Sequence, residues 1–199
     1  MAYKQHFIEW FSGKQLPSYW TTNDLSGTNT FAMADEVDGG FKITTASGSN
    51  NAGSLDFNDK RPFSATGSEI ISVVKLNSTS LMTSLTALSN NGGLNPQFVA
   101  IGMDTTDYST SLFSVGSMDS GFSKTDTGSA LDTDWHNFKL ILSSSDIKGY
   151  IDGVLKVTKT TNRPTLALQP HYQVRTRTTS SKSGQIRYME CYNTWPNQS

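Results

Sequence analysis

The segment "DWHNFKLILSSSDIKGYIDGVLKVTKTTNRP", Asp134–Pro164, decides the fold class of this chain. Its residues Phe138, Leu140 and Leu142 alternate with polar neighbours, and this period of two is typical of a half-buried β-strand. The dipeptide Asp152-Gly153 then separates two short runs of β-branched and aromatic residues. It favours a two-residue hairpin turn, because both of its residues tolerate a positive φ. The segment therefore predicts an antiparallel meander of three strands.

The rest of the chain repeats this alternation of short strands and turns. Loops rich in Gly, Ser, Asn and Thr are expected at 38–40, 47–53, 90–93, 125–129 and 178–184. Between them, apolar or alternating runs predict strands near 5–10, 29–35, 40–45, 53–57, 69–76, 80–88, 97–103, 111–117, 135–142, 147–151, 154–158, 166–177 and 185–192. We therefore predict an all-β chain, a two-sheet antiparallel β-sandwich of the jelly-roll type, with a single domain over residues 1–199.

Composition excludes several classes of partner. The 199 residues carry 16 basic and 17 acidic side chains and a net charge of -1, so no electrostatic footprint for nucleic acid is expected. No apolar run approaches the roughly 18 residues of a membrane span, which predicts no membrane insertion. The start "MAYKQHFIEWF" lacks the apolar core of a signal peptide. The chain is therefore expected either to fold in the cytoplasm or to have lost such a signal.

Several stretches carry a resemblance to a known superfamily. The opening "FSGKQLPSYW" precedes a strand marked by Gly39-Gly40, "DWHNFKLIL" precedes the Asp-Gly hairpin, and "GQIRYMECYN" closes the chain. In this order the motifs resemble the concanavalin A-like lectin/glucanase superfamily, whose jelly rolls include laminin-G-like sandwiches. The resemblance implies a closing strand that lies beside the first strand, and a concave sheet that binds polysaccharide. It leaves the activity open, because one architecture hosts lectins, hydrolases, lyases and shell proteins.

The carboxylates argue against the glycosidases of that superfamily. Those enzymes resemble one another in a Glu-x-Asp-x-Glu or Glu-x-Asp-x-x-Glu strand, because alternate residues share a face and a retaining pair needs carboxyl groups about 5 Å apart. Of the four glutamates here, only Glu36 has a second carboxylate at strand spacing, Asp38, and "VDGG" reads as a turn; Asp132 and Asp134 likewise flank a loop. The Arg-x-Glu-Leu, Gln-Ile-His and Tyr-Phe-Lys strands of alginate-lyase-like members are absent as well. We predict no catalytic residues.

The run "QPHYQVRTRT", Gln169–Thr178, is the main candidate for binding. With a period of two, one face of the strand carries the four long polar side chains and the other carries Tyr172, Val174 and Thr176. The polar face is either solvated or lines the concave sheet, where arginines would hold acidic groups or hydroxyls in forked hydrogen bonds. A lyase would use the same residue types. The predicted carbohydrate-binding residues are His171, Gln173, Arg175 and Arg177.

Metal ions and cofactors are not expected. The histidines His6, His136 and His171 belong to no spaced ligand motif. Some members of the superfamily bind calcium through an acidic residue of the closing strand, but here that strand begins with Gln185 and Glu190 comes late. We therefore predict no metal ligand and no cofactor, and calcium is left as an open alternative.

The remaining aromatic and sulfur-containing residues have structural interpretations. Cys191 is expected to be a small buried residue rather than a catalytic thiol. Trp20 and Trp135, which open strands, are expected to be buried between the two sheets. Trp195 either plugs one end of the sandwich or forms an exposed contact.

These inferences lead to one functional hypothesis with two alternatives. The chain is predicted to bind a polysaccharide or cell-surface glycan on its concave sheet without cutting it, using His171, Gln173, Arg175 and Arg177. The alternatives are an enzyme that degrades polysaccharide, either a lyase or a relative of glycoside hydrolases, and a structural protein without a small ligand. A virion component or an extracellular protein fits the hypothesis, as does a homo-oligomer.

Overall fold

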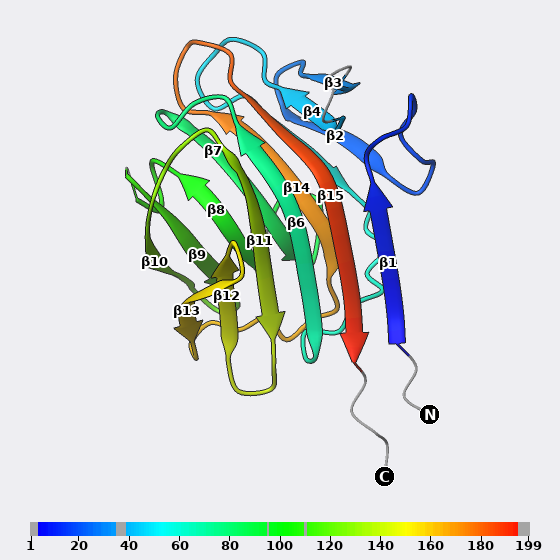
Figure 1. Cartoon of the computed structure of the whole chain (residues 1–199), viewed down its shortest axis with the longest axis vertical. Coiled ribbons are helices and arrows are strands. Elements are labelled where there is room, and N and C mark those ends of the chain that lie inside the picture. The colour runs from blue at the N-terminus through cyan, green and yellow to red at the C-terminus, as the bar shows by residue number, and fades with distance from the viewer. Residues whose placement is uncertain (1–3, 35–38, 95, 110, 195–199) are drawn as a thin grey trace.

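The computed structural model describes residues 4–34, 39–94, 96–109 and 111–194. These residues form two antiparallel sheets packed face to face (Figure 1). No helix that could cross a membrane occurs in these ranges. The predicted all-β sandwich is therefore confirmed. The predictions made for Glu36, Asp38 and Trp195 fall outside the described residues.

An eight-stranded sheet forms one layer of the sandwich. Its strands run in the order β13-β12-β11-β6-β15-β4-β3, and β1 pairs with β15. Their bounds are β1 (Lys4–Trp10), β3 (Thr30–Met33), β4 (Phe41–Thr44), β6 (Ser68–Leu76), β11 (Trp135–Leu142), β12 (Ile147–Ile151), β13 (Val154–Lys159) and β15 (Ser183–Thr194).

A seven-stranded sheet forms the other layer, in the order β10-β9-β8-β7-β14-β5-β2. Its strands are β2 (Thr21–Ser26), β5 (Ala52–Asp56), β7 (Met82–Ser89), β8 (Phe98–Asp104), β9 (Leu112–Met118), β10 (Phe122–Ala130) and β14 (Gln169–Thr176).

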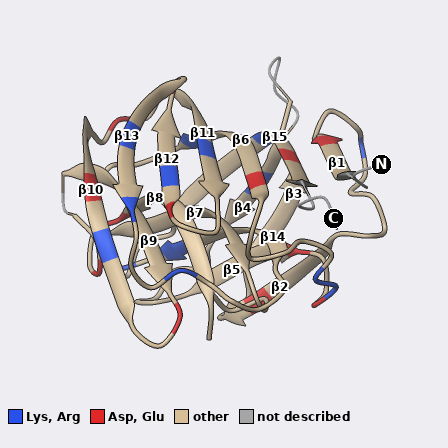
Figure 2. Cartoon of the chain, turned by 90° about the horizontal axis from the view of Figure 1, so that it is seen from below, with Lys and Arg blue, Asp and Glu red and all other residues tan. Residues whose placement is uncertain are grey.

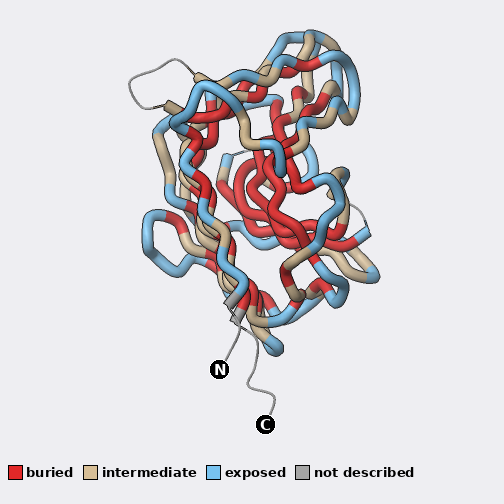
Figure 3. Tube along the Cα trace, turned by 90° about the vertical axis from the view of Figure 1, so that its right-hand side faces the viewer, coloured by how far each residue is buried: buried red, intermediate tan, exposed pale blue. Residues whose placement is uncertain are grey.

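The core lies between the sheets and follows from alternation along the strands. In β11 the residues Phe138, Leu140 and Leu142 are buried, as their spacing predicts, and they face apolar side chains of the other sheet such as Phe113. Buried segments concentrate in the middle of the molecule and exposed ones on its outside (Figure 3). Alternation therefore gives strands such as β4, β6, β11 and β12 one face for the core and one face for the outside, whereas β5, β7 and β8 are buried along their whole length.

The meander at 134–164 is confirmed as β11, β12 and β13. The two-residue turn between β12 and β13 has positive φ at both positions, 51° at Asp152 and 79° at Gly153. The closing strand β15 lies beside β1, as the resemblance implied. Cys191 on β15 is fully buried in the core, and this burial raises the pKa of its thiol.

Two strands were not predicted from the sequence. The segment 125–129, expected to be a loop, belongs to β10, and 21–26 forms β2. Both are edge strands with mostly polar and partly exposed side chains. An edge strand is held by backbone hydrogen bonds to a single neighbouring strand. Because few of its side chains are buried, its sequence lacks the apolar alternation from which strands are predicted. A register shift between Asp126 and Ala130 further obscures the pattern in β10.

The two tryptophans have different environments. Trp20 is buried between Phe7 of β1 and Phe57, which follows β5, so it bridges the two sheets as predicted. The prediction for Trp135 was wrong, because this side chain lies on the outer face of the eight-stranded sheet. There its ring is covered by Lys75 and Arg187, with the Arg187 guanidinium 4.7 Å from the ring centroid. Trp135 is three residues from Phe138, and residues an odd number apart in a strand point to opposite faces.

Charged side chains are spread over the molecule rather than gathered by sign. Figure 2 shows acidic and basic residues interspersed on the strands and loops of both sheets. Among the described residues, this mixture of signs matches the small net charge.

Candidate functional site

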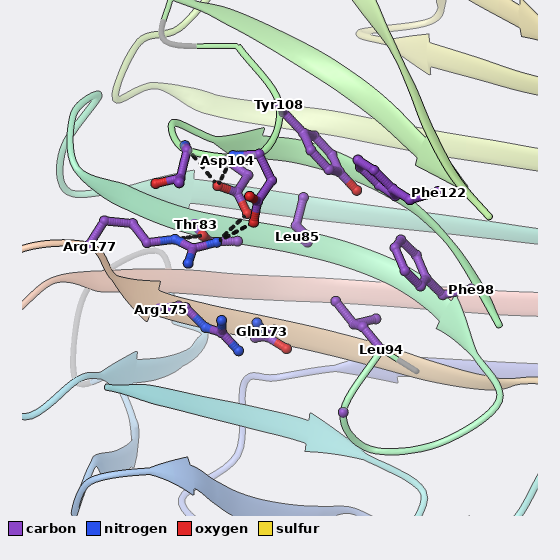
Figure 4. Close-up of a pocket in the computed structure, with 13 residues that line it drawn as sticks. Thr83, Leu85, Leu94, Phe98, Asp104, Tyr108, Phe122, Gln173, Arg175 and Arg177 are labelled. Carbon is purple, nitrogen blue, oxygen red and sulfur yellow. Dashed lines mark hydrogen bonds and ion pairs between the residues drawn. The ribbon is translucent and has the colours of Figure 1, made fainter. Parts of the chain in front are cut away.

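Strand β14 separates its side chains between the core and the outer face of the seven-stranded sheet. Tyr172 and Val174 are fully buried in the core. Gln173 and Arg175 point the other way and line a pocket on the outer face (Figure 4). Arg177, which follows the end of β14, lines the same pocket. The division of this strand into two faces is therefore as predicted.

The register of the neighbouring strands places further residues beside β14. Arg175 pairs with Thr83 of β7, and Thr83 pairs with Asp104 of β8, so these three form one row across the sheet. The next row contains Gln173 and Leu85. Figure 4 shows Arg175 and Arg177 at one side of the pocket and aromatic side chains at the other.

The pocket has a volume of about 540 Å³ and combines polar and apolar walls. It is formed by β7, β8, β10 and β14 and by two loops, and its lining residues are Thr83, Leu85, Gly93, Leu94, Phe98, Asp104, Thr106, Asp107, Tyr108, Phe122, Gln173, Arg175 and Arg177. This volume lies within the range of pockets that hold small ligands, which is about 300–1,000 Å³.

Arg177 is held by a network of acceptors at the polar side of the pocket. Its Nη2 donates to Asp104 Oδ2 and to Asp107 Oδ2, each at 2.8 Å. Its Nε donates to Thr83 Oγ1 at 3.1 Å, and its Nη1 donates to Asn50 Oδ1 at 3.2 Å. Four hydrogen bonds therefore hold the Arg177 side chain, which positions the two carboxylates at this side of the pocket.

Arg175 and Gln173, in contrast, are not held by such a network of acceptors. Arg175 Nε is buried and has no hydrogen-bond partner among the described residues, whereas the buried side chain of Gln173 interacts with that of His171. Burial, with the charge of Arg177 next in importance, lowers the pKa of Arg175. Buried polar atoms in native proteins nearly always have partners, so unpaired atoms that line a pocket indicate a place for a ligand or for water.

The apolar side of the pocket is an aromatic wall that rests on a small second core. Phe98, Tyr108 and Phe122 form this wall, with Tyr108 and Phe122 stacked at 5.5 Å between ring centroids. Phe98 and Tyr108 are buried together with Leu85 on the outer face of the sheet. The Phe122 side chain remains partly exposed, so one ring of the wall is accessible from the solvent.

His171 is on the predicted face of β14 but is not among the residues that line the pocket. It is fully buried, with Nδ1 3.8 Å from Asp56 Oδ2. The turn after β7 packs against the same region, where Ser54 Oγ donates to the carbonyl oxygen of Gly92 at 3.3 Å. Burial lowers the pKa of His171 to about 4 and raises the pKa of Asp56. His171 therefore lies beneath the outer surface as a neutral side chain at neutral pH.

The sequence did not single out several residues of the pocket. Phe98, Tyr108, Phe122 and Asp104 come from three separate parts of the chain. Only long-range strand pairing brings them beside β14, and one-dimensional patterns do not encode the order of strands in a sheet. The polar alternation of β14 was the one local signal, and it identified Gln173 and Arg175.

The carboxylates of the pocket do not form a glycosidase pair on one strand. Asp104 ends β8 and Asp107 follows it in a turn, and both bind Arg177. Glu69 and Glu190 lie on the eight-stranded sheet, where they pair with Lys139 and with His6. In the described ranges, no group of three or more His, Cys, Asp or Glu side chains is placed to hold a metal ion.

Comparisons with known proteins define the fold. No family model matches the chain, and no curated protein sequence matches it. Among solved structures it is similar to the pseudo β-1,3-glucanase Rv0315 of Mycobacterium tuberculosis, with 12% identity over 95% of this chain and 98% of that one and a TM-score of 0.68. It is also similar to the β-glucanase of Bacillus licheniformis, with 12% identity over 96% and 98% of the two chains and a TM-score of 0.67.

A third similar structure is the Crh5 transglycosylase, with 12% identity over 96% of this chain and 85% of that one and a TM-score of 0.66. The chain therefore has the concanavalin A-like jelly-roll fold of β-glucanases, as the resemblance of its motifs implied. At this level of identity the likeness concerns the architecture, and the function must be argued from the site.

Proposed function

We propose that this chain binds a polysaccharide or a cell-surface glycan in the pocket on the outer face of the seven-stranded sheet, without cutting it. One observation carries the proposal: the buried Nε of Arg175 lacks a hydrogen-bond partner among the described residues, in a pocket whose other side is aromatic. A sugar ring has an apolar face that packs on aromatic rings, and hydroxyl groups that exchange hydrogen bonds with amide and guanidinium groups. The pocket offers both kinds of contact.

Three of the four predicted binding residues, Gln173, Arg175 and Arg177, contribute to this pocket, and each has a different part in the proposal. Gln173 and Arg175 would contact the glycan directly. Arg177 would act through Asp104 and Asp107, because both donors of its Nη2 are taken by these carboxylates. His171 would support the floor of the site, since it is buried.

Affinity electrophoresis tests the proposal. The protein is run through gels cast with neutral and acidic polysaccharides, beside Phe122→Ala in the aromatic wall and Trp10→Ala as a control. Trp10 is another exposed aromatic residue, but it lies on β1 of the other sheet. Retardation that Phe122→Ala abolishes and Trp10→Ala preserves is the expected result. Unretarded migration in every gel would argue instead for a structural role without a small ligand.

A polysaccharide-degrading enzyme is the second candidate, and one observation favours it. Asp104 and Asp107 line the same pocket, and two carboxylates are what most glycoside hydrolases use. In this structure both carboxylates bind Arg177, so catalysis would require their cluster to open. Release of reducing ends from a polysaccharide, lost in both Asp104→Asn and Asp107→Asn, would replace the binding proposal by this one.

The setting of the proposed activity stays a prediction. A domain that binds glycans would meet them as a virion component or as an extracellular protein, and a homo-oligomer would present several pockets at once. Multivalent presentation raises the avidity for a repeating polymer without any new contact. The mass of the protein in solution tests whether it forms such an oligomer.

A further inference from the structure

Arg175 forms no ion pair with another residue of the described ranges, although the charges of Asp104 and Asp107 act on it from nearby. Two positions further on, Arg177 takes both nearby carboxylates, Asp104 and Asp107, through its Nη2. None of the ion pairs between described residues includes Arg175. Neighbouring arginines in similar positions on one face therefore differ: one is neutralised by the protein and the other is not.

The position of Arg175 makes this lack of a partner significant. Its side chain lines the pocket, and its Nε is buried without an acceptor. A buried donor without a partner destabilises a protein, and the effect is larger for a charged group. Burial and the neighbouring Arg177 lower the pKa of Arg175 more than Asp104 and Asp107 raise it, so the surroundings of Arg175 disfavour its positive charge. An anion bound at this point would offset both effects.

Gln173 adds a neutral hydrogen-bonding group next to this cation. It lies two residues before Arg175 on the same face of β14, where its side chain lines the pocket and also interacts with that of the buried His171. An amide oxygen accepts hydrogen bonds, so it matches a hydroxyl group rather than an anion. A cation beside an acceptor, opposite an aromatic wall, thus matches a sugar ring that carries both a negative group and hydroxyls.

We propose that the ligand is an acidic glycan whose negatively charged oxygen group, a uronic acid carboxylate or a sulfate ester, binds to Arg175. The inference rests on the proposed function of the pocket and names the class of polymer that it selects. The guanidinium group donates parallel hydrogen bonds to two oxygens of such an anion. The Gln173 amide group exchanges a hydrogen bond with a neighbouring hydroxyl, and the ring packs toward Phe122.

The preference for an anion arises at Arg175 rather than from the pocket as a whole. Arg177, Asp104 and Asp107 together carry one net negative charge, which the charge of Arg175 balances, so these four groups sum to zero at a distance. Attraction of the polymer therefore depends on one partly buried cation, and salt is expected to weaken binding of an acidic polymer more than that of a neutral one.

The test compares acidic polymers with their own neutral forms. Wild-type protein is run through gels cast with polygalacturonate, alginate or hyaluronan, with each of these after chemical reduction of its carboxyl groups, and with dextran sulfate or dextran. Arg175→Gln removes the charge, Arg175→Lys keeps it, and Arg61→Gln is the matched control. Arg61 is a partly exposed arginine whose pairing with Asp59 is long, at 3.8 Å.

We expect wild-type protein and Arg61→Gln to bind at least one uronate polymer or dextran sulfate about tenfold more tightly than its neutral form, and Arg175→Gln to lose this preference. Arg175→Lys should retain part of it. Binding of carboxylate polymers alone, or of dextran sulfate alone, would identify which anion is recognised. Circular dichroism establishes whether each variant is folded, and the comparison of wild-type protein on paired polymers needs no variant.

Two results would overturn the inference in different ways. Equal retention by acidic and neutral forms, or a preference for acidic polymers that survives in Arg175→Gln, would show that Arg175 does not bind an anionic group. The proposed glycan-binding function would still stand. Absence of retention by all polymers, acidic and neutral, would remove the proposed function itself and the inference with it.

Discussion

The hydroxyl oxygen of Tyr108 lies directly over Gly116, where a β-carbon added to Gly116 would be only 1.9 Å away. Tyr108 comes from the loop between β8 and β9, and Gly116 lies within β9. The missing side chain at Gly116 is therefore what allows the tyrosine ring to lie against the sheet and to stack on Phe122. A single glycine shapes the aromatic side of the pocket.

Gly116→Ala should displace Tyr108 and destabilise the protein. Overpacking of this kind costs about 1–3 kcal/mol, and chemical denaturation measures it as a lower free energy of unfolding. Gly13→Ala is the matched control, because an added β-carbon there meets only ordinary contacts at 3.6 Å or more. An unchanged free energy of unfolding in Gly116→Ala would mean that the tyrosine relaxes without cost.

The two carboxylates that bind Arg177 should differ in their contribution to stability. The Asp104 side chain is 5% exposed and also accepts hydrogen bonds from the backbone of Thr106 and Asp107. The Asp107 side chain is 59% exposed. We expect Asp104→Asn to lower the free energy of unfolding by about 1–3 kcal/mol and Asp107→Asn by less than about 1 kcal/mol. Equal losses in urea denaturation would contradict this ranking.

His171 should make the protein less stable in mild acid. Because burial lowers its pKa to about 4, the folded state binds fewer protons than the unfolded state between about pH 6.5 and pH 4. The free energy of unfolding therefore falls as the pH falls through this window, by up to about 3 kcal/mol. The raised pKa of Asp56 acts in the opposite sense above its ordinary value, so the net slope is smaller.

His171→Asn separates this contribution from the rest of the titration. The difference in free energy of unfolding between wild-type protein and the variant should shrink as the pH is lowered from 6.5 to 4. Denaturation at several pH values measures that difference directly. A difference that stays constant with pH would show that His171 does not titrate in this window.

His136 should have the opposite effect. Its Nδ1 is 2.7 Å from Asp152 Oδ2 and its Nε2 is 2.8 Å from Asp132 Oδ1, so two carboxylates bracket the ring. Burial opposes the charged form, but the hydrogen bonds to Asp152 and Asp132 outweigh it and raise the pKa of His136. Its stabilising contribution is therefore complete below about pH 6.5 and is lost as the pH rises through the folded-state pKa.

His136→Gln should remove the loss of stability that the wild-type protein shows as the pH rises above about 6.5. We expect thermal unfolding of the wild-type protein to shift to lower temperature between about pH 6.5 and pH 8 more than that of the variant. Asp152→Asn should remove part of the effect, since it takes away one of the two acceptors. A parallel pH dependence of the wild-type protein and both variants would contradict the role of this pair.

Much of the fold could be predicted from local patterns. The direction in which a strand side chain points is a local property, because successive residues point to opposite faces. This alternation placed Phe138 in the core, and Tyr172 opposite to Gln173, before any contact was known. The turn at Asp152-Gly153 was predictable because positive φ at both residues is a property of the dipeptide itself. The same rule, applied to Trp135 and Phe138, would have placed Trp135 on the outer face.

The candidate site was only half predictable. The sequence by itself determined the sandwich, the hairpin and the row of Gln173 and Arg175, because each depends on residues close together in the chain. Only the tertiary structure brought Asp104, Tyr108 and Phe122 to this row, paired Arg177 and left Arg175 unpaired, and buried His171. Lateral strand order and burial depend on how all the strands pack together, and that packing has no local signature in the chain.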